Sequence, residues 1–156
     1  MFHIVLYQPE IPPNTGNIMR LCANAPAVLH LIEPLGFVLD DRRLRRAGMD
    51  YRDLACVERH SGLAACRQAL GPRRWLAFTT RGTVCHSAWA FQPGDVLMFG
   101  PETRGLPADV LEEIPAAQRL CIPQLPGARS INLGNAVAIG LFEAWRQIGF
   151  AMEKST

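Results

Sequence analysis

The sequence predicts an α/β fold in which a mostly parallel sheet is covered by helices on both faces. Three observations support this. Short apolar segments alternate with segments of helical periodicity along the 156 residues. The apolar segments are hydrophobic on both faces, as the strands of a buried parallel sheet are. Several of them run directly into loops rich in glycine, proline and polar residues. The length and the absence of a linker or repeat predict one domain, residues 1–156.

The first half of the chain alternates strands with helices. In order, the expected elements are a strand at 2–7, a helix that Asn14 caps and Pro26 ends, a strand at 28–32, a short basic helix from Asp40, a weaker strand at 55–58 and a helix at 63–70. Asn14 is assigned to the cap because its side chain can accept a hydrogen bond from a free backbone N–H at a helix start. Pro26 cannot continue a helix.

The second half ends in the longest helix. Its expected elements are strands at 75–79, 96–99 and 120–122, a short helix at 109–113 and a long helix that Ser130 or Asn132 caps. The buried face of the long helix follows from residues at helical spacing: Leu133, Val137, Leu141, Ala144, Trp145 and Ile148. Small residues from Gly134 to Gly140 lie on two sides of the helix. They favour close approach to the sheet and, on the other side, to a second subunit.

Four loops are expected to form the functional site. They start at Pro9, Thr79, Gly100 and Pro123, each after a predicted strand. In open α/β sheets, ligands bind outside the carboxyl ends of the strands, so these loops should converge. Neither the G-x-G-x-x-G fingerprint nor a P-loop is present. Backbone N–H and C=O groups of such Gly/Pro loops are suited to reading the edge of an adenine.

Asn14, Asn17 and Arg20 are three residues apart near the start of the first helix, which places them on one face. Fifteen of the sixteen basic residues are arginine, and the densest group is Arg42, Arg43, Arg45 and Arg46. This bias fits either the base composition of the gene or recognition of phosphate groups, for which guanidinium is well suited. A solvated face and a nucleic-acid contact both remain open for the four clustered arginines.

Composition excludes several classes of protein. The chain has no run of about 18 apolar residues and no basic region before its first apolar segment, so we expect neither a membrane protein nor a secreted one. The five cysteines are unpaired in spacing and are expected to be buried free thiols in the cytoplasm. The four histidines are isolated in sequence, no metal site is predicted, and no nucleophile and base pair is evident.

Three segments together resemble the motifs of the SPOUT RNA methyltransferases. They are 14–24 (NTGNIMRLCAN), 97–107 (LMFGPETRGLP) and 122–137 (IPQLPGARSINLGNAV), in this order. The resemblance extends over nearly the whole chain and is greatest to the single-domain tRNA (cytidine/uridine-34)-2′-O-methyltransferases. Two positions depart from the family pattern: residues 25–27 (APA) follow the first motif, and Phe142 stands where many relatives have tyrosine.

The resemblance implies a fold, a reaction and a set of site residues. The C-terminal segment would be threaded into a trefoil knot, S-adenosylmethionine would bind in the knot loops, and two chains would form a homodimer. The substrate would be the anticodon stem-loop of tRNA, with leucine tRNAs expected, methylated on the ribose of nucleotide 34. By position, Phe78, Gly100, Ile122 and Ser130 would bind the cofactor. Substrate binding and catalysis would fall to Asn14, Arg20, Glu102, Ser130 and Asn132.

The implied reaction needs alignment of oxygen, methyl carbon and sulfur and loss of the hydroxyl proton, without a metal. Arg20 is the family's candidate for proton removal, but an arginine is always protonated, so we interpret it as a clamp on the adjacent phosphate. A 2′-hydroxyl target favours RNA over DNA. The alternatives are methylation at another tRNA or rRNA position, a non-catalytic RNA-binding module and a nicotinamide-dependent enzyme, although the last lacks its glycine fingerprint.

Overall fold

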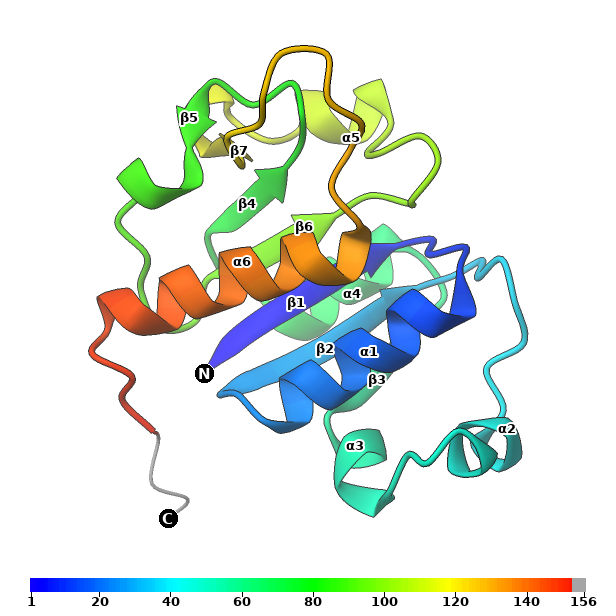
Figure 1. The fold of residues 1–156 in the computed structure, drawn as a ribbon. Helices are drawn as coiled ribbons and strands as arrows, with labels where there is room; N and C mark the ends of the chain where they lie inside the picture. The colour runs from blue at the N-terminus through cyan, green and yellow to red at the C-terminus, as the bar shows by residue number, and fades with distance from the viewer. Residues whose placement is uncertain (153–156) are drawn as a thin grey trace.

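The computed structural model describes residues 1–152 and contains one seven-stranded sheet, in which every strand pair is parallel. The strand order is β3-β2-β1-β6-β4-β7-β5 (Figure 1). The strands are β1 (Phe2–Tyr7), β2 (Ala27–Ile32), β3 (Val57–His60), β4 (Trp75–Phe78), β5 (Val84–Cys85), β6 (Val96–Phe99) and β7 (Arg119–Cys121). The predicted α/β class and parallel sheet are therefore confirmed.

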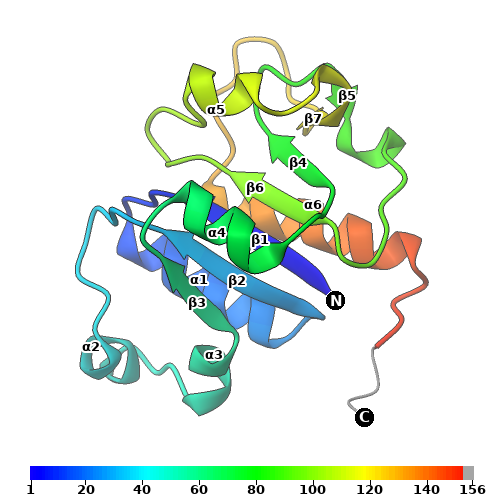
Figure 2. The same cartoon turned by 180° about the vertical axis from the view of Figure 1, so that it is seen from behind.

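Helices cover both faces of the sheet, as predicted. Figure 1 shows α1 (Pro12–Ala23) and α6 (Leu133–Gln147) side by side on one face. Figure 2 shows α4 (Leu63–Leu70) and α5 (Ala108–Glu112) on the other. The remaining helices are short: α2 (Asp41–Arg46), α3 (Tyr51–Ala55) and the 3-10 turns η1 (His86–Ala88) and η2 (Ala116–Gln118). Among the described residues, no helix is long and apolar enough to cross a lipid bilayer.

The central strands separate two hydrophobic cores. Ile4, Leu6, Leu29 and Leu97 point toward α1 and α6, where they pack against residues such as Val137. Val5, Ile32, Ala77 and Met98 point the other way, toward α4 and α5. Strands with apolar side chains on both faces are buried on both faces, which is why the sequence shows continuous apolar runs rather than alternation.

Two expected elements are displaced by two or more residues. The strand expected at 55–58 lies at Val57–His60. The first helix begins at Pro12, three residues earlier than a cap at Asn14 predicts, because proline is favoured in the first turn of a helix, where its missing N–H costs nothing. Its N-cap is therefore Ile11, which makes no side-chain cap, and the prediction that Asn14 caps the helix is wrong. Asn132 caps α6 as expected, by accepting from the Asn135 N–H.

Strand β7 lies between β4 and β5, although β4 and β5 are consecutive in the chain. The loop that joins them must therefore cross the end of β7. Gly82 is the point of closest approach, since a Cβ there would lie 2.5 Å from the Leu120 carbonyl carbon and 2.8 Å from the Cys121 nitrogen. An interleaved connection of this kind is what a trefoil knot requires. The threading of the chain itself stays a prediction.

Candidate active site

The loops after β1, β4, β6 and β7 converge on one cleft at the carboxyl ends of these strands, as predicted. Its volume is about 430 Å³. The residues that line it come from four segments: Ile11 and Asn14; Thr79–Arg81; Gly100–Leu106; and Ser130–Leu133 with Ala136. Segments that are distant in the chain therefore meet because parallel strands end at the same edge.

A chain of hydrogen bonds joins the three motif segments across this cleft. The Asn132 amide donates from Nδ2 to Asn14 Oδ1 at 3.0 Å. The Asn14 amide in turn donates from Nδ2 to Glu102 Oε1 at 3.3 Å. Asn14 is 7% exposed, so its amide is largely removed from water and depends on these two partners. Asn14, Glu102 and Asn132 therefore hold the three loops in register.

Glu102 also satisfies the start of α1 from outside the helix. Its carboxylate accepts from the Glu10 N–H at 2.8 Å and from the Ile11 N–H at 3.0 Å. The first two residues of α1 are prolines and have no N–H. The N–H groups of Glu10 and Ile11, just before the helix, are therefore the donors closest to its start. A carboxylate at a helix N-terminus is also favoured by the helix dipole. Glu102 thus anchors the two residues that lead into α1, whereas the first free helical N–H groups, of Asn14 and Thr15, donate to the Ile11 carbonyl.

Gly100 is a point of close backbone approach within the loop after β6. A Cβ at this position would lie 2.2 Å from the Leu106 nitrogen and 2.3 Å from the Gly105 carbonyl carbon. Such contacts are impossible without moving backbone, so only glycine permits this tight turn. Gly105, with φ of +67°, adopts the left-handed conformation that completes it. The wall of the cleft is consequently formed by backbone at this point.

The predicted site residues divide into two groups. Five of them line the cleft: Asn14, Gly100, Glu102, Ser130 and Asn132. Ser130 is exposed and its hydroxyl makes no hydrogen bond with the described residues, which leaves it available to a ligand.

The other three predicted residues lie elsewhere. Phe78 is 7% exposed and stacks on Phe99 beneath α6, with ring centroids 4.6 Å apart. Ile122 packs against the same core. Arg20 lies two turns of α1 beyond Asn14, and its guanidinium donates to the Gly48 carbonyl at 3.0 Å. None of these three residues lines the cleft that one chain forms.

Arg20 instead lines a second hollow, a groove of about 390 Å³ between α1 and the segment from Phe37 to Met49. Its floor is apolar, with Pro12, Pro13, Phe37 and Leu44 among the lining residues. Asn17 and Arg43 also line it. The expected shared face of Asn14, Asn17 and Arg20 is thus split: Asn14 faces the cleft, and the other two face the groove.

Arg81 and Arg104 line the cleft but were not selected from the sequence. Both side chains are exposed, and Arg104 donates to Gln8 Oε1 at 3.2 Å. Arg81 follows the buried strand β4 and Arg104 follows β6 by a few residues. An arginine just after a buried strand is the sequence signal that could have identified both. Two guanidinium groups give the cleft a positive rim suited to phosphate.

The interpretation of the histidines as isolated is wrong. His3, His30 and His60 lie on neighbouring strands β1, β2 and β3 and form a row on the face that α4 covers. The His3 Nδ1 and His30 Nε2 atoms are 2.9 Å apart, and the His30 Nδ1 and His60 Nε2 atoms are 3.0 Å apart. Burial, together with the neighbouring imidazoles, lowers the pKa of His30 to about 3. Sequence spacing could not show this, because parallel register brings distant residues side by side.

The cysteines are free thiols, as expected, although only Cys22 and Cys66 are fully buried. Burial raises the pKa of the Cys66 thiol to about 11. At Cys85 the hydrogen bond from Ser87 lowers the pKa.

Comparison with known proteins places this geometry in context. Residues 1–142 match the sequence model of a family described as the SpoU rRNA Methylase family. The chain is 58% identical over 150 residues to the tRNA (cytidine(34)-2′-O)-methyltransferase of Escherichia coli K12, with 96% of each protein covered. A solved structure described as giving structural insights into the 2-OH methylation of C/U34 on tRNA has a TM-score of 0.86 and 45% identity, covering 96% of this chain and 91% of that one. The AdoMet-bound rRNA methyltransferase of Sinorhizobium meliloti has a TM-score of 0.80 and 27% identity, covering 94% of this chain and 56% of that one.

Proposed function

Since the chain belongs to the SpoU rRNA Methylase family, within the SPOUT methyltransferases, we propose that it is a tRNA (cytidine(34)-2′-O)-methyltransferase. It transfers a methyl group from S-adenosylmethionine to the ribose 2′-oxygen of the wobble nucleotide, C34 or a modified U34. One observation of the structure carries this proposal. The three motif segments meet at a single cleft and are tied together there by the hydrogen bonds between Asn132, Asn14 and Glu102.

The residues around Gly100 fit an adenosyl cofactor. The cleft is walled by backbone where Gly100 approaches Gly105 and Leu106, and a wall of this kind suits the flat edge of a base. Ser130 adds a hydroxyl without a protein partner in the described chain. S-adenosylmethionine supplies an electrophilic methyl group when bound. Phe78 supports the cofactor loop from below, since its ring lies under Gly140 and its backbone continues into Thr79.

Glu102 positions the loops and is not the proton acceptor in this proposal. It is the only carboxylate that lines the cleft among the described residues. Its two oxygens already accept from two backbone N–H groups and one amide, and these hydrogen bonds keep the carboxylate in place. Asn14 and Asn132 likewise hold the loops. The substrate 2′-hydroxyl is aligned by the walls of the cleft.

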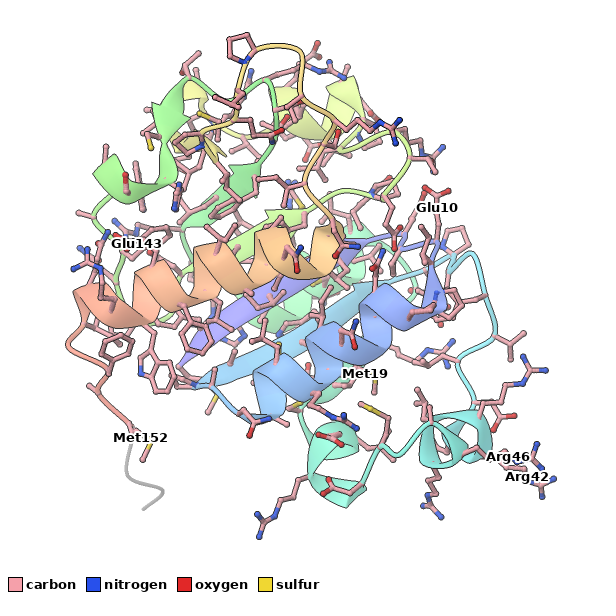
Figure 3. All side chains as sticks on the ribbon, viewed as in Figure 1. Glu10, Met19, Arg42, Arg46, Glu143 and Met152 are labelled. Carbon is pink, nitrogen blue, oxygen red and sulfur yellow. The ribbon has the colours of Figure 1, made fainter. Side chains whose placement is uncertain are left out.

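The RNA is held by arginines. Arg81 and Arg104 lie at the cleft, and Arg20 lies in the adjoining groove with Arg43. The exposed helix α2 contains Arg43 and adds three more arginines that, like it, form no ion pair with described residues: Arg42, Arg45 and Arg46. Arg42 and Arg46 extend away from the rest of the molecule (Figure 3). We assign Arg20 to a phosphate of the RNA, because it lies outside the cleft and an arginine cannot accept a proton. Neutralised phosphates dominate the affinity for nucleic acid.

We also propose a homodimer whose interface is formed by α1 and α6. Gly140 is used against the chain's own sheet, where a Cβ would lie 2.8 Å from the Phe78 ring, so it is not available to a partner. The support comes from apolar side chains left exposed at the start of α1 and on α6: Ile11 (41%), Ile139 (37%) and Phe142 (41%). Sedimentation at micromolar concentration should show the wild type as a dimer and Ile139→Glu as a monomer. A wild-type monomer contradicts it.

Four further assignments rest on the same proposal. Residues 1–156 act as one unit, the segment after β7 threads a trefoil knot, and the substrates include leucine tRNAs. The protein acts in the cytoplasm, because tRNA is its substrate.

The decisive experiment measures methyl transfer from tritiated S-adenosylmethionine to tRNA of a strain that lacks this modification. We expect label in the 2′-O-methylated nucleoside of position 34 after nucleoside mapping. The matched control is the same tRNA with 2′-deoxycytidine at position 34, which should take no label. Label at another nucleotide refutes the assigned position. RNA binding without any label favours a binding module, and calorimetric binding of NAD in place of S-adenosylmethionine refutes the cofactor.

A further inference from the structure

We propose that this protein binds one Zn²⁺ ion beneath α4, in a site formed by His30, His60, Cys66 and Glu58. The site lies on the face of the sheet opposite α1 and α6, and none of its residues lines the candidate active site. This inference is therefore independent of the methyltransferase proposal.

The strands and α4 bring four ligands of three types together. His30 lies in β2, level with Glu58 of the edge strand β3, and His60 lies two residues further along β3 on the same face. Cys66 comes from α4, which packs on this face. The Cys66 sulfur and the two imidazole nitrogens all lie within 4.8 Å of one another. Three elements separated in sequence thus direct nitrogen and sulfur ligands to one point.

The distances among the His30, His60 and Glu58 ligand atoms are close to those of a tetrahedral site. The His30 Nδ1 and His60 Nε2 atoms are 3.0 Å apart. Glu58 Oε2 lies 3.4 Å from His30 Nδ1 and 3.9 Å from His60 Nε2. Ligand atoms of a tetrahedral zinc ion, with bonds of about 2.0–2.3 Å, are roughly 3.3–3.6 Å apart. The nitrogen and carboxylate atoms already have nearly this spacing, and the Cys66 sulfur, within 4.8 Å of both nitrogens, moves in by up to roughly 1 Å to complete the site.

The surroundings also favour metal binding. His30 is 1% exposed, and its other nitrogen, Nε2, is 2.9 Å from His3 Nδ1. An outer imidazole that accepts from the ligand's second N–H fixes the ring orientation and directs Nδ1 inward. Cys66 is fully buried, whereas the Glu58 side chain is 57% exposed at the rim, where an ion can enter. One thiolate and one carboxylate balance the charge of Zn²⁺, so the occupied site is neutral.

The donor set indicates the ion and its role. Imidazole and thiolate ligands select zinc over calcium or magnesium, which prefer oxygen. Four protein ligands leave no position for water, which is typical of a structural site rather than a catalytic one. The ion joins β2, the edge strand β3 and α4. Cys66 binds as the thiolate, so its thiol proton is released to solvent on binding.

The test uses the full-length, untagged chain after dialysis against a chelator. The protein is equilibrated with Zn²⁺, passed through a desalting column and analysed by mass spectrometry for metal content. We expect about one zinc per chain. Cys66→Ala should retain essentially none, whereas Cys22→Ala, which removes an equally buried cysteine from the other core, should retain the ion. Replacement by Co²⁺ should give a thiolate-to-cobalt absorption band that Cys66→Ala lacks.

Because Cys66→Ala changes a buried residue and can misfold, two surface variants test the site independently. Glu58→Gln removes an exposed ligand and should weaken Zn²⁺ binding, whereas Glu112→Gln, an exposed carboxylate on α5, should not. His3→Asn should lower the affinity roughly 10- to 100-fold, as expected for an outer partner of a ligand. The proposal is overturned if the wild type retains no zinc, or if Cys66→Ala and Cys22→Ala retain equal amounts. In that case the row of histidines serves only to give its buried ring nitrogens hydrogen-bond partners.

Discussion

Replacing Gly82 by alanine tests the crossing of the β4–β5 loop over β7. The new Cβ would lie 2.5 Å from the Leu120 carbonyl carbon, 2.7 Å from its oxygen and 2.8 Å from the Cys121 nitrogen. All three are backbone atoms, so the loop and the strand must separate by roughly 1 Å to restore ordinary contact. That movement also strains the hydrogen bond from the Thr79 N–H to the Leu120 carbonyl, now 2.9 Å.

The cost follows from these contacts. Overpacking costs about 1–3 kcal/mol, and a weakened hydrogen bond adds about 0.5–1.5 kcal/mol. We therefore expect Gly82→Ala to lower the free energy of unfolding by about 2–4 kcal/mol and Tm by roughly 4–15 °C. Gly16 is the matched control, because it lies inside α1 with no atom within 4 Å of a new Cβ. Gly16→Ala should raise stability by about 0.5–1 kcal/mol.

Urea unfolding at one protein concentration measures both variants. The same substitution should thus shift stability in opposite directions at the two glycines, with the m-value unchanged. Gly82→Ala should also reduce methyl transfer, since Thr79–Arg81 line the cleft. If both variants unfold within about 0.5 kcal/mol of the wild type, the loop does not press on β7 as the structure indicates.

Three more predictions concern the candidate site and the C-terminal helix. Glu102→Ala should lower the free energy of unfolding by about 1–3 kcal/mol, because the N–H groups of Glu10 and Ile11 lose their acceptor, and it should reduce methylation. Glu112→Ala, which removes an exposed carboxylate, should change neither. If urea unfolding shows the two variants to be equally stable, Glu102 does not hold the start of α1. Arg20→Ala should reduce methylation by about 10- to 150-fold, whereas the cofactor affinity measured by calorimetry should not change. Arg20→Lys should restore little of the lost activity. If Arg20→Ala methylates nearly as well as the wild type at subsaturating RNA, Arg20 is not part of the site. The hydrogen bonds from Arg146 lower the pKa of Glu143 to about 2, so the ionised carboxylate stabilises the fold fully above pH 4.5 and this contribution is lost as the pH falls toward 2. The stability difference between wild type and Glu143→Gln, measured across this range, should disappear at the acid end; a difference that is constant with pH would contradict the pairing.

The sequence determined the secondary structure and the location of the site. Apolar runs and helical spacing predict most strands and helices to within one or two residues, because local burial patterns set them. The convergence of the loops also follows from the sequence, since parallel strands end at one edge and Thr79, Gly100 and Ser130 each follow one. Asn132 at the cap of α6 is likewise a local feature.

Tertiary structure decided what the individual polar residues do. Asn14 has the residue type of a cap, yet its side chain bonds to Glu102, 88 positions away, and to Asn132. Gly82 is ordinary in sequence, and its necessity appears only where the loop crosses Leu120 of β7.

The histidines show the same limit. His30 and His60 are thirty positions apart and show no ligand spacing, but the parallel register of β2 and β3 places their nitrogens 3.0 Å apart beside Cys66. Local sequence carries the propensity of each segment. Contacts between segments depend on strand order and register, which arise only when the whole sheet buries its two faces at once.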